Sequence, residues 1–144
     1  MRLLMVAMLV AASGAHAQLA PEVRVDFSAT GAQRRAEAGA GLGAAMGPYL
    51  RAGLSVSYDL TASAGQPRRL RVENLIRFLF DPIAQDRWAL SVGGGLGVRQ
   101  RAYMMVAAEL EGPRIKGARP ALQYALGAGQ RLALVIRRAR NGRR

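Results

Sequence analysis

Carboxylates are the side chains of this sequence with the clearest capacity for chemistry. The 144-residue chain has no Cys and a single His, His16, so it offers no disulfide, Cys-based zinc site or thiol nucleophile. His is the usual general base, and His16 lies in a segment that we expect to be removed. A hydrolase would depend on two carboxylates such as Glu73 and Glu109, but no spacing in the sequence specifies a catalytic pair. We therefore predict no enzymatic activity and no catalytic, cofactor or metal site.

A glycine motif is the other candidate for chemistry. Gly39, Gly41 and Ala44 have the spacing of the dinucleotide-binding fingerprint. That fingerprint needs a buried parallel strand before it and a helix after it, because the pyrophosphate binds at the helix N-terminus. Neither pattern is present here, so we do not predict nucleotide binding.

The first 17 residues have the layout of a secretory signal peptide. Met1 and Arg2 form a basic start, an apolar run covers 3–12, and Ala15-His16-Ala17 fits the small-x-small cleavage pattern. This apolar run is too short to span a bilayer. We predict cleavage of residues 1–17, one domain over 18–138 and a basic disordered tail over 139–144. An exported chain rarely meets nucleic acid, so the net charge of +12 does not predict a nucleic-acid partner.

The domain must be built from strands, because its apolar residues recur at every second position. The segment 50–60 alternates without a fault, which predicts a strand with two different faces. The same pattern predicts eight strands, separated by Gly- and Pro-rich turns. Short connections favour antiparallel pairing in chain order, an up-and-down meander. The predicted strands cover residues 23–28, 36–46, 50–60, 70–80, 88–98, 102–110, 121–128 and 131–137.

The two faces of these strands differ in charge and in glycine content. One face carries no charged residue, and the other mixes a few large charged residues with many glycines. A water-facing surface contains little Gly, whereas a narrow lumen needs small residues to accommodate the large ones. We therefore predict an all-β, eight-stranded antiparallel transmembrane barrel with apolar residues toward lipid and a polar, plugged lumen. The alternative is a soluble periplasmic barrel that binds an apolar small molecule inside; its stability without detergent would identify it.

Polar residues on the inward face are predicted to form a network in the lumen. Turn positions pair Gln123 with Arg137, Glu109 with Gln123 and with Ser91, and bring Arg137 near Arg24 and Asp26. They also place Asp59 near Arg71 and Tyr103 over Gly97. We interpret the network as structural, since buried charges must be paired; the alternative is a gated path for water or ions. The predicted lumen residues are Asp26, Arg51, Asp59, Arg71, Glu73, Arg77, Glu109, Gln123 and Arg137.

Arginines and aromatic residues gather at the predicted strand ends. One hypothesis is that the arginines at alternate connections, with Arg131, bind anionic lipid or polysaccharide phosphates; the alternative is that they lie in solvated loops. Trp88, Tyr49 and Tyr58 are consistent with an interfacial belt or with plain packing. The predicted anionic contacts are Arg34, Arg35, Arg68, Arg69, Arg99 and Arg101.

The whole chain after residue 17 resembles the small outer-membrane β-barrel proteins of bacteria, the OmpA/OmpX-like class. The resemblance is carried by the strand patterns at 50–60, 70–80 and 88–98 and by the signal peptide. It implies an outer-membrane protein of structural or interaction type, embedded in a lipid bilayer and without enzymatic activity. We expect a monomer. One departure is that the last strand, 131–137, lacks the terminal aromatic residue that barrel assembly recognises in this class.

Overall fold

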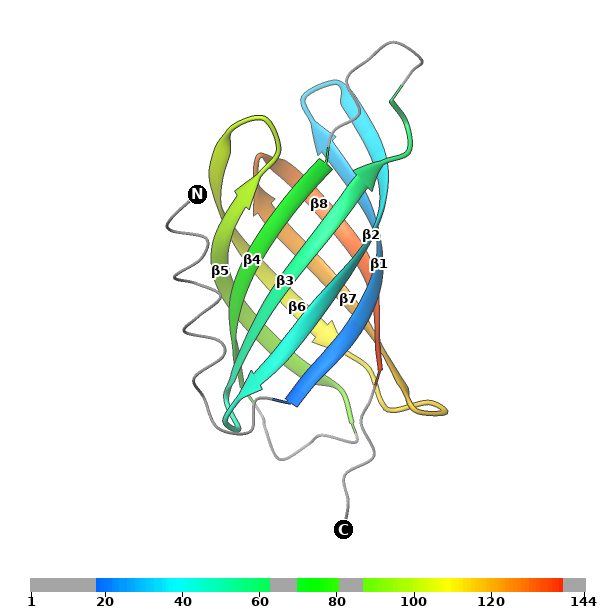
Figure 1. Cartoon of the computed structure of the whole chain (residues 1–144), viewed down its shortest axis with the longest axis vertical. Helices are drawn as coiled ribbons and strands as arrows, with labels where there is room; N and C mark the ends of the chain where they lie inside the picture. Colours follow the sequence, from blue (N-terminus) through cyan, green and yellow to red (C-terminus); the bar gives the residue numbers. More distant parts are fainter. Residues whose placement is uncertain (1–17, 63–69, 81–86, 139–144) are drawn as a thin grey trace.

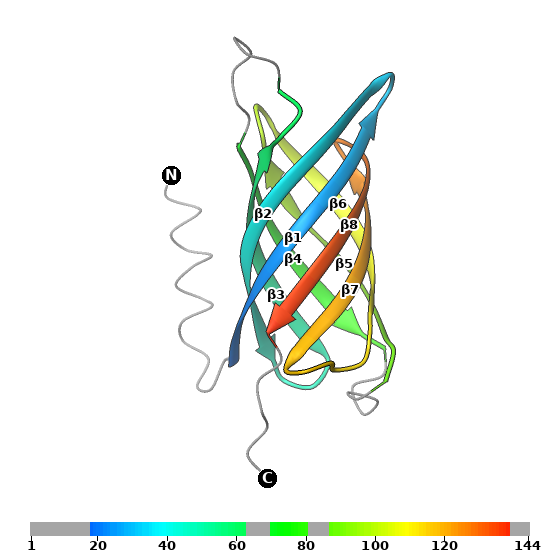
Figure 2. The same cartoon turned by 90° about the vertical axis from the view of Figure 1, so that its right-hand side faces the viewer.

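A computed structural model describes residues 18–62, 70–80 and 87–138, which form a closed antiparallel barrel in chain order. Each strand pairs with its neighbours in the sequence, and β8 pairs with β1 to close the sheet (Figures 1 and 2). The segments predicted as a signal peptide (1–17) and a basic tail (139–144) lie outside the described residues, as do Arg68 and Arg69. The strands are β1 (Gln18–Thr30), β2 (Gln33–Met46), β3 (Leu50–Asp59), β4 (Leu70–Leu79), β5 (Ala89–Val98), β6 (Ala102–Glu111), β7 (Ala118–Gly127) and β8 (Gly129–Arg138).

Several strands begin earlier than the sequence pattern predicted. The predicted strands 23–28 and 121–128 begin at Gln18 and Ala118 in the structure. Pro21 and Pro120 lie within these added residues, and each is just beyond the last ladder pair with one neighbouring strand. At those positions no backbone N–H has to donate to that neighbouring strand, so a proline is tolerated within the strand.

Away from the strand ends, the outward positions of the strands carry no charged residue, and the charged side chains point inward among small and apolar residues. Met104 and Ile76 are 80% and 52% exposed, whereas Asp26 and Glu37 are 0% exposed. This is the orientation predicted for a transmembrane barrel, and it contradicts the soluble alternative with an apolar interior. No helix in the described part of the chain is long and apolar enough to cross a membrane.

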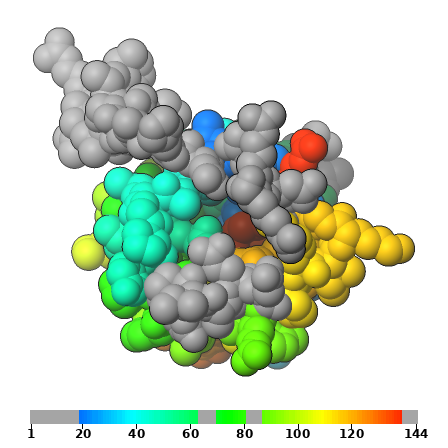
Figure 3. Space-filling model, turned by 90° about the horizontal axis from the view of Figure 1, so that it is seen from below, coloured from blue at the N-terminus to red at the C-terminus, as the bar shows by residue number. Residues whose placement is uncertain are grey.

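The two ends of the barrel are distinguished by the turns and chain ends that lie there. In Figure 1 the β1–β2 turn lies at the upper end, while β1 begins and β8 ends at the lower end. Seen from below, the β2–β3 turn and the β6–β7 connection occupy opposite sides of the lower rim (Figure 3). The terms upper and lower are used below in this sense.

Glycines on β5 let its inner wall approach neighbouring atoms closely. A Cβ atom on Gly93 or Gly95 would lie 1.9 Å from a backbone carbonyl oxygen of β4. A Cβ on Gly97 would lie 2.3 Å from the ring of Tyr103, the residue opposite it in β6. These positions therefore exclude any side chain, and Gly97 leaves the space that Tyr103 fills.

The barrel interior as candidate functional site

Every acidic residue in the described part of the chain is buried in the barrel interior. These acids come from five strands, and each lies at an inward position of its strand's two-residue alternation. They are Glu22, Asp26, Glu37, Asp59, Glu73, Glu109 and Glu111. Since each charge has left bulk water, each must be paired for the barrel to be stable.

Arg71 of β4 organises an upper cluster, defined as Asp26, Glu37, Arg71, Glu73 and Arg131. Its guanidinium forms an ion pair with Asp26, lies 2.8 Å from Glu37 Oε2 and lies 3.4 Å from Glu73 Oε1. Arg131 of β8 forms a second ion pair with Glu73. The upper cluster thus joins four strands across the lumen.

Tyr103 and Arg99 extend the upper cluster toward the upper opening. The Tyr103 hydroxyl donates a hydrogen bond to Glu73 Oε1 at 2.6 Å. Arg99, in the β5–β6 connection, forms an ion pair with Glu37. Partial burial lowers the pKa of the Arg99 guanidinium, and the positive charge of nearby Arg35 acts in the same direction.

Arg137 of β8 organises a lower cluster, defined as Glu22, Arg77, Glu109, Glu111 and Arg137. Its Nε lies 2.7 Å from Glu22 Oε2, and its two terminal nitrogens contact Glu109 and Glu111 at 2.7 Å and 3.0 Å. Arg77 of β4 forms a further ion pair with Glu109 from the opposite wall. One guanidinium therefore holds three carboxylates.

Arg24 and Gln123 connect the two clusters. An Arg24 nitrogen donates to Asp26 Oδ1 and to Gln123 Oε1, both at 2.9 Å. The Gln123 amide then donates to Glu109 Oε2 at 3.1 Å. A continuous polar chain consequently runs along the lumen from Asp26 to Glu109.

Some predicted pairings are wrong because one turn lies elsewhere. Gln123 lies opposite Ala133 rather than Arg137, since the β7–β8 turn is centred on Ala128 and not near Gln130. Gly129, with φ of +126°, adopts the backbone conformation that this tight turn needs. When the centre of the turn moves by two residues, the residue of β8 that lies opposite a given residue of β7 changes by four positions. The other two hairpins have the predicted register, with Glu109 opposite both Gln123 and Ser91.

Barrel closure also differs from the prediction. Arg137 lies opposite Glu22 of β1, and not beside Arg24 and Asp26. Arg71 lies opposite Ser57 in β4's pairing with β3, so it does not reach Asp59 as predicted. The carboxylate of Asp59 instead lies 3.7 Å from Arg35 and accepts hydrogen bonds from Thr61.

The remaining predicted lumen residue, Arg51, is half-buried at the lower end, where its Nε lies 4.0 Å from Glu111. Several interior residues were not among the predicted site. Glu22, Glu111 and Arg119 lay outside the predicted strand bounds, and extending the inward alternation by one or two residues would have found them. The other buried charged residues that the predicted site did not include are Arg24, Glu37 and Arg131.

The rim arginines divide into two kinds. Arg35 and Arg99 turn inward to acids, whereas Arg34 and Arg101 are exposed and have no ion pair with any residue the structure describes. Arg131, which the sequence placed at a connection, points into the lumen.

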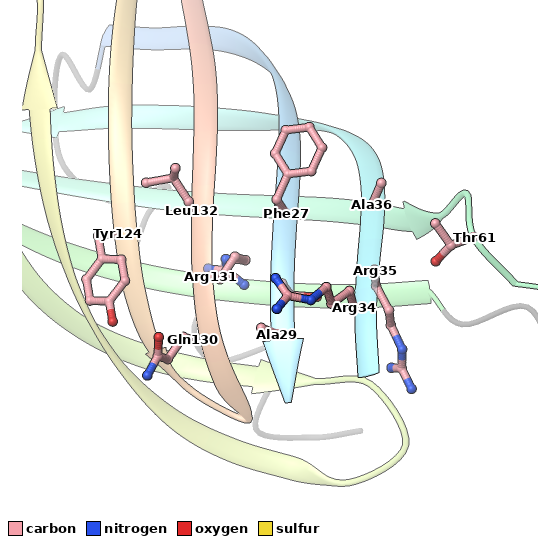
Figure 4. A pocket seen from close by; sticks show the side chains of 11 residues that line it. Phe27, Ala29, Arg34, Arg35, Ala36, Thr61, Tyr124, Gln130, Arg131 and Leu132 are labelled. Atoms are coloured by element: carbon pink, nitrogen blue, oxygen red, sulfur yellow. The ribbon is translucent and has the colours of Figure 1, made fainter. Parts of the chain in front are cut away.

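A trough of about 450 Å³ lies beside Arg34 at the upper rim (Figure 4). Phe27, Leu132 and Tyr124 line its apolar side, and Ala29 lies between Arg34 and Gln130 in the strand ladders. A cation therefore borders an apolar surface at this rim.

Aromatic residues cluster at the lower rim. The rings of Tyr49 and Phe78 stack with centroids 5.7 Å apart, and Phe80 contacts Phe78 edge-on at 5.9 Å. Trp88 is exposed at the same end, while Tyr58 lies near the upper end of β3. Among the described residues, no group of three or more Asp, Glu or His side chains could hold a metal ion.

Comparison with known proteins identifies the fold. No protein-family model and no curated protein matches the sequence. Two de novo designed transmembrane β-barrels are similar in structure. One has a TM-score of 0.63 at 15% identity, covering 85% of this chain and 98% of the design. The other, the solution NMR structure of the design TMB2.3, has a TM-score of 0.64 at 12% identity, covering 87% and 95%.

A natural barrel is similar to the same degree. The crystal structure of the N-terminal β-barrel domain of Pseudomonas aeruginosa OprF has a TM-score of 0.60 at 14% identity, covering 85% of this chain and 98% of that domain. These likenesses show the fold, an eight-stranded antiparallel barrel of the transmembrane type.

Proposed function

We propose that this protein is an outer-membrane β-barrel of structural or interaction type, with a lumen closed by ion pairs and without enzymatic activity. The observation that carries the proposal is the sorting of side chains, with apolar residues on the outer wall and every described acid inside. A charge facing lipid at mid-bilayer costs about 2–4 kcal/mol, so this sorting suits a hydrocarbon environment. The likeness to the OprF barrel domain supports the outer membrane as its location.

The closed lumen is supported by the way the two clusters fill it. Arg71 and Arg137 each reach carboxylates on several strands, and Arg24 with Gln123 fills the space between them. The void beside the upper cluster measures about 30 Å³, which is room for roughly one or two water molecules. We infer that the ion pairs hold the strands in register and leave no path for hydrated ions.

Membrane fractionation with a heat-modifiability gel tests the membrane placement. The folded protein should remain in the membrane fraction and migrate differently before and after boiling. Purified protein that stays monodisperse without detergent would overturn the proposal. Conductance in planar bilayers, with a porin as positive control, tests the closed lumen separately: we expect no channel openings, and a stable open level would contradict closure.

A second proposal concerns the upper rim, where we infer a contact with anionic lipid or polysaccharide phosphates. Arg34 is exposed, is not neutralised by any described acid, and borders the apolar trough of Figure 4. Arg101 is exposed at the same end, and Arg68 and Arg69 belong to a connection outside the described residues. Guanidinium groups bind phosphate oxygens in a bidentate manner.

Vesicle reconstitution tests this contact. Arg34→Gln with Arg101→Gln should reduce binding to vesicles that contain lipopolysaccharide or anionic phospholipid, compared in separate arms with zwitterionic vesicles. Arg138→Gln, an exposed arginine at the lower end, is the matched control. Equal binding by both variants would remove the upper rim as the contact.

A further inference from the structure

Asn74 of β4 is an amide on the outer wall of the barrel. It lies at the middle of Leu70–Leu79, and its outward neighbours on β4 are Val72 and Ile76. The other outward positions away from the ends of the described strands carry aliphatic residues, proline, glycine or aromatic residues, and no other amide. The Asn74 side chain has no hydrogen-bond partner among the described residues.

An unpaired amide is costly in this position. The hydrocarbon region offers no water, so each unsatisfied polar group costs roughly several kcal/mol there. An Asn side chain carries both a donor and an acceptor, so two such amides can satisfy each other with two hydrogen bonds. Polar side chains of this kind promote association between transmembrane helices, and water is equally absent at the outer wall of a barrel in hydrocarbon.

The surface around Asn74 is suited to close approach. Leu54 of β3 and Leu96 of β5 lie opposite Asn74 in the ladders, and Ala52 and Gly94 lie opposite Ile76 in the same way. Gly94 occupies an outward position but has no side chain. A second surface can therefore approach the barrel closely beside Asn74. Figure 1 shows β3, β4 and β5 side by side on one face of the barrel.

We propose that a second copy of this chain docks on the β3–β5 wall about a two-fold axis beside Asn74, with the two Asn74 amides hydrogen-bonded to each other. A two-fold axis brings the same residue of both copies together, so a self-complementary side chain at the axis closes the assembly at two copies. The outward positions near Asn74 on these three strands carry no charged residue. The wall therefore has no charge that would favour an oppositely charged partner over a second copy. This dimer departs from the monomer expected from the sequence, and it rests on the membrane placement proposed above but not on the closed lumen.

Cross-linking tests the docking wall, because the chain has no native Cys to interfere. Ile76→Cys places a thiol on the proposed interface, and Leu134→Cys places one on β8, on the opposite side of the eight-stranded ring. Both purified variants are reconstituted in lipid vesicles and treated with a short thiol cross-linker. We expect a cross-linked dimer from Ile76→Cys only. Equal or no cross-linking from the two variants, with both inserted, would overturn the proposal.

Substitution of Asn74 tests the amide itself. Asn74→Leu should raise the dimer dissociation constant about tenfold, since two interchain hydrogen bonds are lost, whereas Asn74→Gln retains a donor and an acceptor and should preserve much of the dimer. Energy transfer between labelled copies at increasing lipid dilution measures this constant. An unchanged constant for Asn74→Leu would refute the amide pairing. A heat-modifiable band confirms insertion of each variant, so failure of membrane placement is distinguished from an inserted monomer.

Discussion

Replacing Arg137 with leucine removes the guanidinium that holds the lower cluster together. In the folded protein this group contacts Glu22, Glu109 and Glu111 and is itself 8% exposed. Arg77 would still pair with Glu109, but the other two carboxylates would lose their closest buried cation. We expect the Arg137→Leu barrel to be markedly less stable than the wild type.

The magnitude follows from the burial of the charges. Removing one partner of a buried ion pair costs about 3–5 kcal/mol, because the remaining charge is left uncompensated. Changing Glu109 to leucine in the same chain removes one of those charges together with its partner. The double variant should therefore lose less than the sum of the two single variants, with a coupling of about 1–3 kcal/mol.

Urea unfolding in lipid vesicles measures these differences. The chain has a single Trp, Trp88, which lies at the lower rim beside Gly112, so its fluorescence reports on this end of the barrel. Arg138→Leu is the matched control, because Arg138 is adjacent in sequence but exposed, and its effect should stay within about 0.5 kcal/mol. If Arg137→Leu is as mild as this control, the ion pairs do not stabilise the barrel and the reasoning fails.

Two further predictions concern the walls of the barrel. Gly97→Ala should cost about 1–3 kcal/mol in unfolding free energy, because its Cβ would overlap the Tyr103 ring, whereas Gly53→Ala should be nearly neutral because the nearest atom lies 3.9 Å away; equal effects in urea titrations would contradict this packing. Val106→Arg, at a mid-strand outward position that is 59% exposed, should cost about 2–4 kcal/mol in vesicles, and Ala102→Arg near the strand end about 0–1 kcal/mol. The absence of this depth dependence would show that the outer wall does not face hydrocarbon.

The alternation of residue types was enough to predict eight strands, their antiparallel order and which residues share a face. The predicted strand 50–60 is observed as Leu50–Asp59, with Val56 outward and Ser57 inward. Alternation along one strand is a local property of the backbone, so it can be read without knowing what the strand pairs with. The same alternation placed glycines such as Gly97 on one face with large polar residues, and this combination of sizes indicated a narrow lumen.

Which inward residues meet across the lumen depends on how the strands close into the barrel. Arg24 donates to Gln123, 99 residues away, and Arg137 to Glu22, 115 residues away. These contacts depend on the β7–β8 turn, on the pairing of β8 with β1 and on the stagger of the closed sheet, each of which shifts the register across the lumen. No local pattern encodes that stagger, because it is fixed only when all eight strands close.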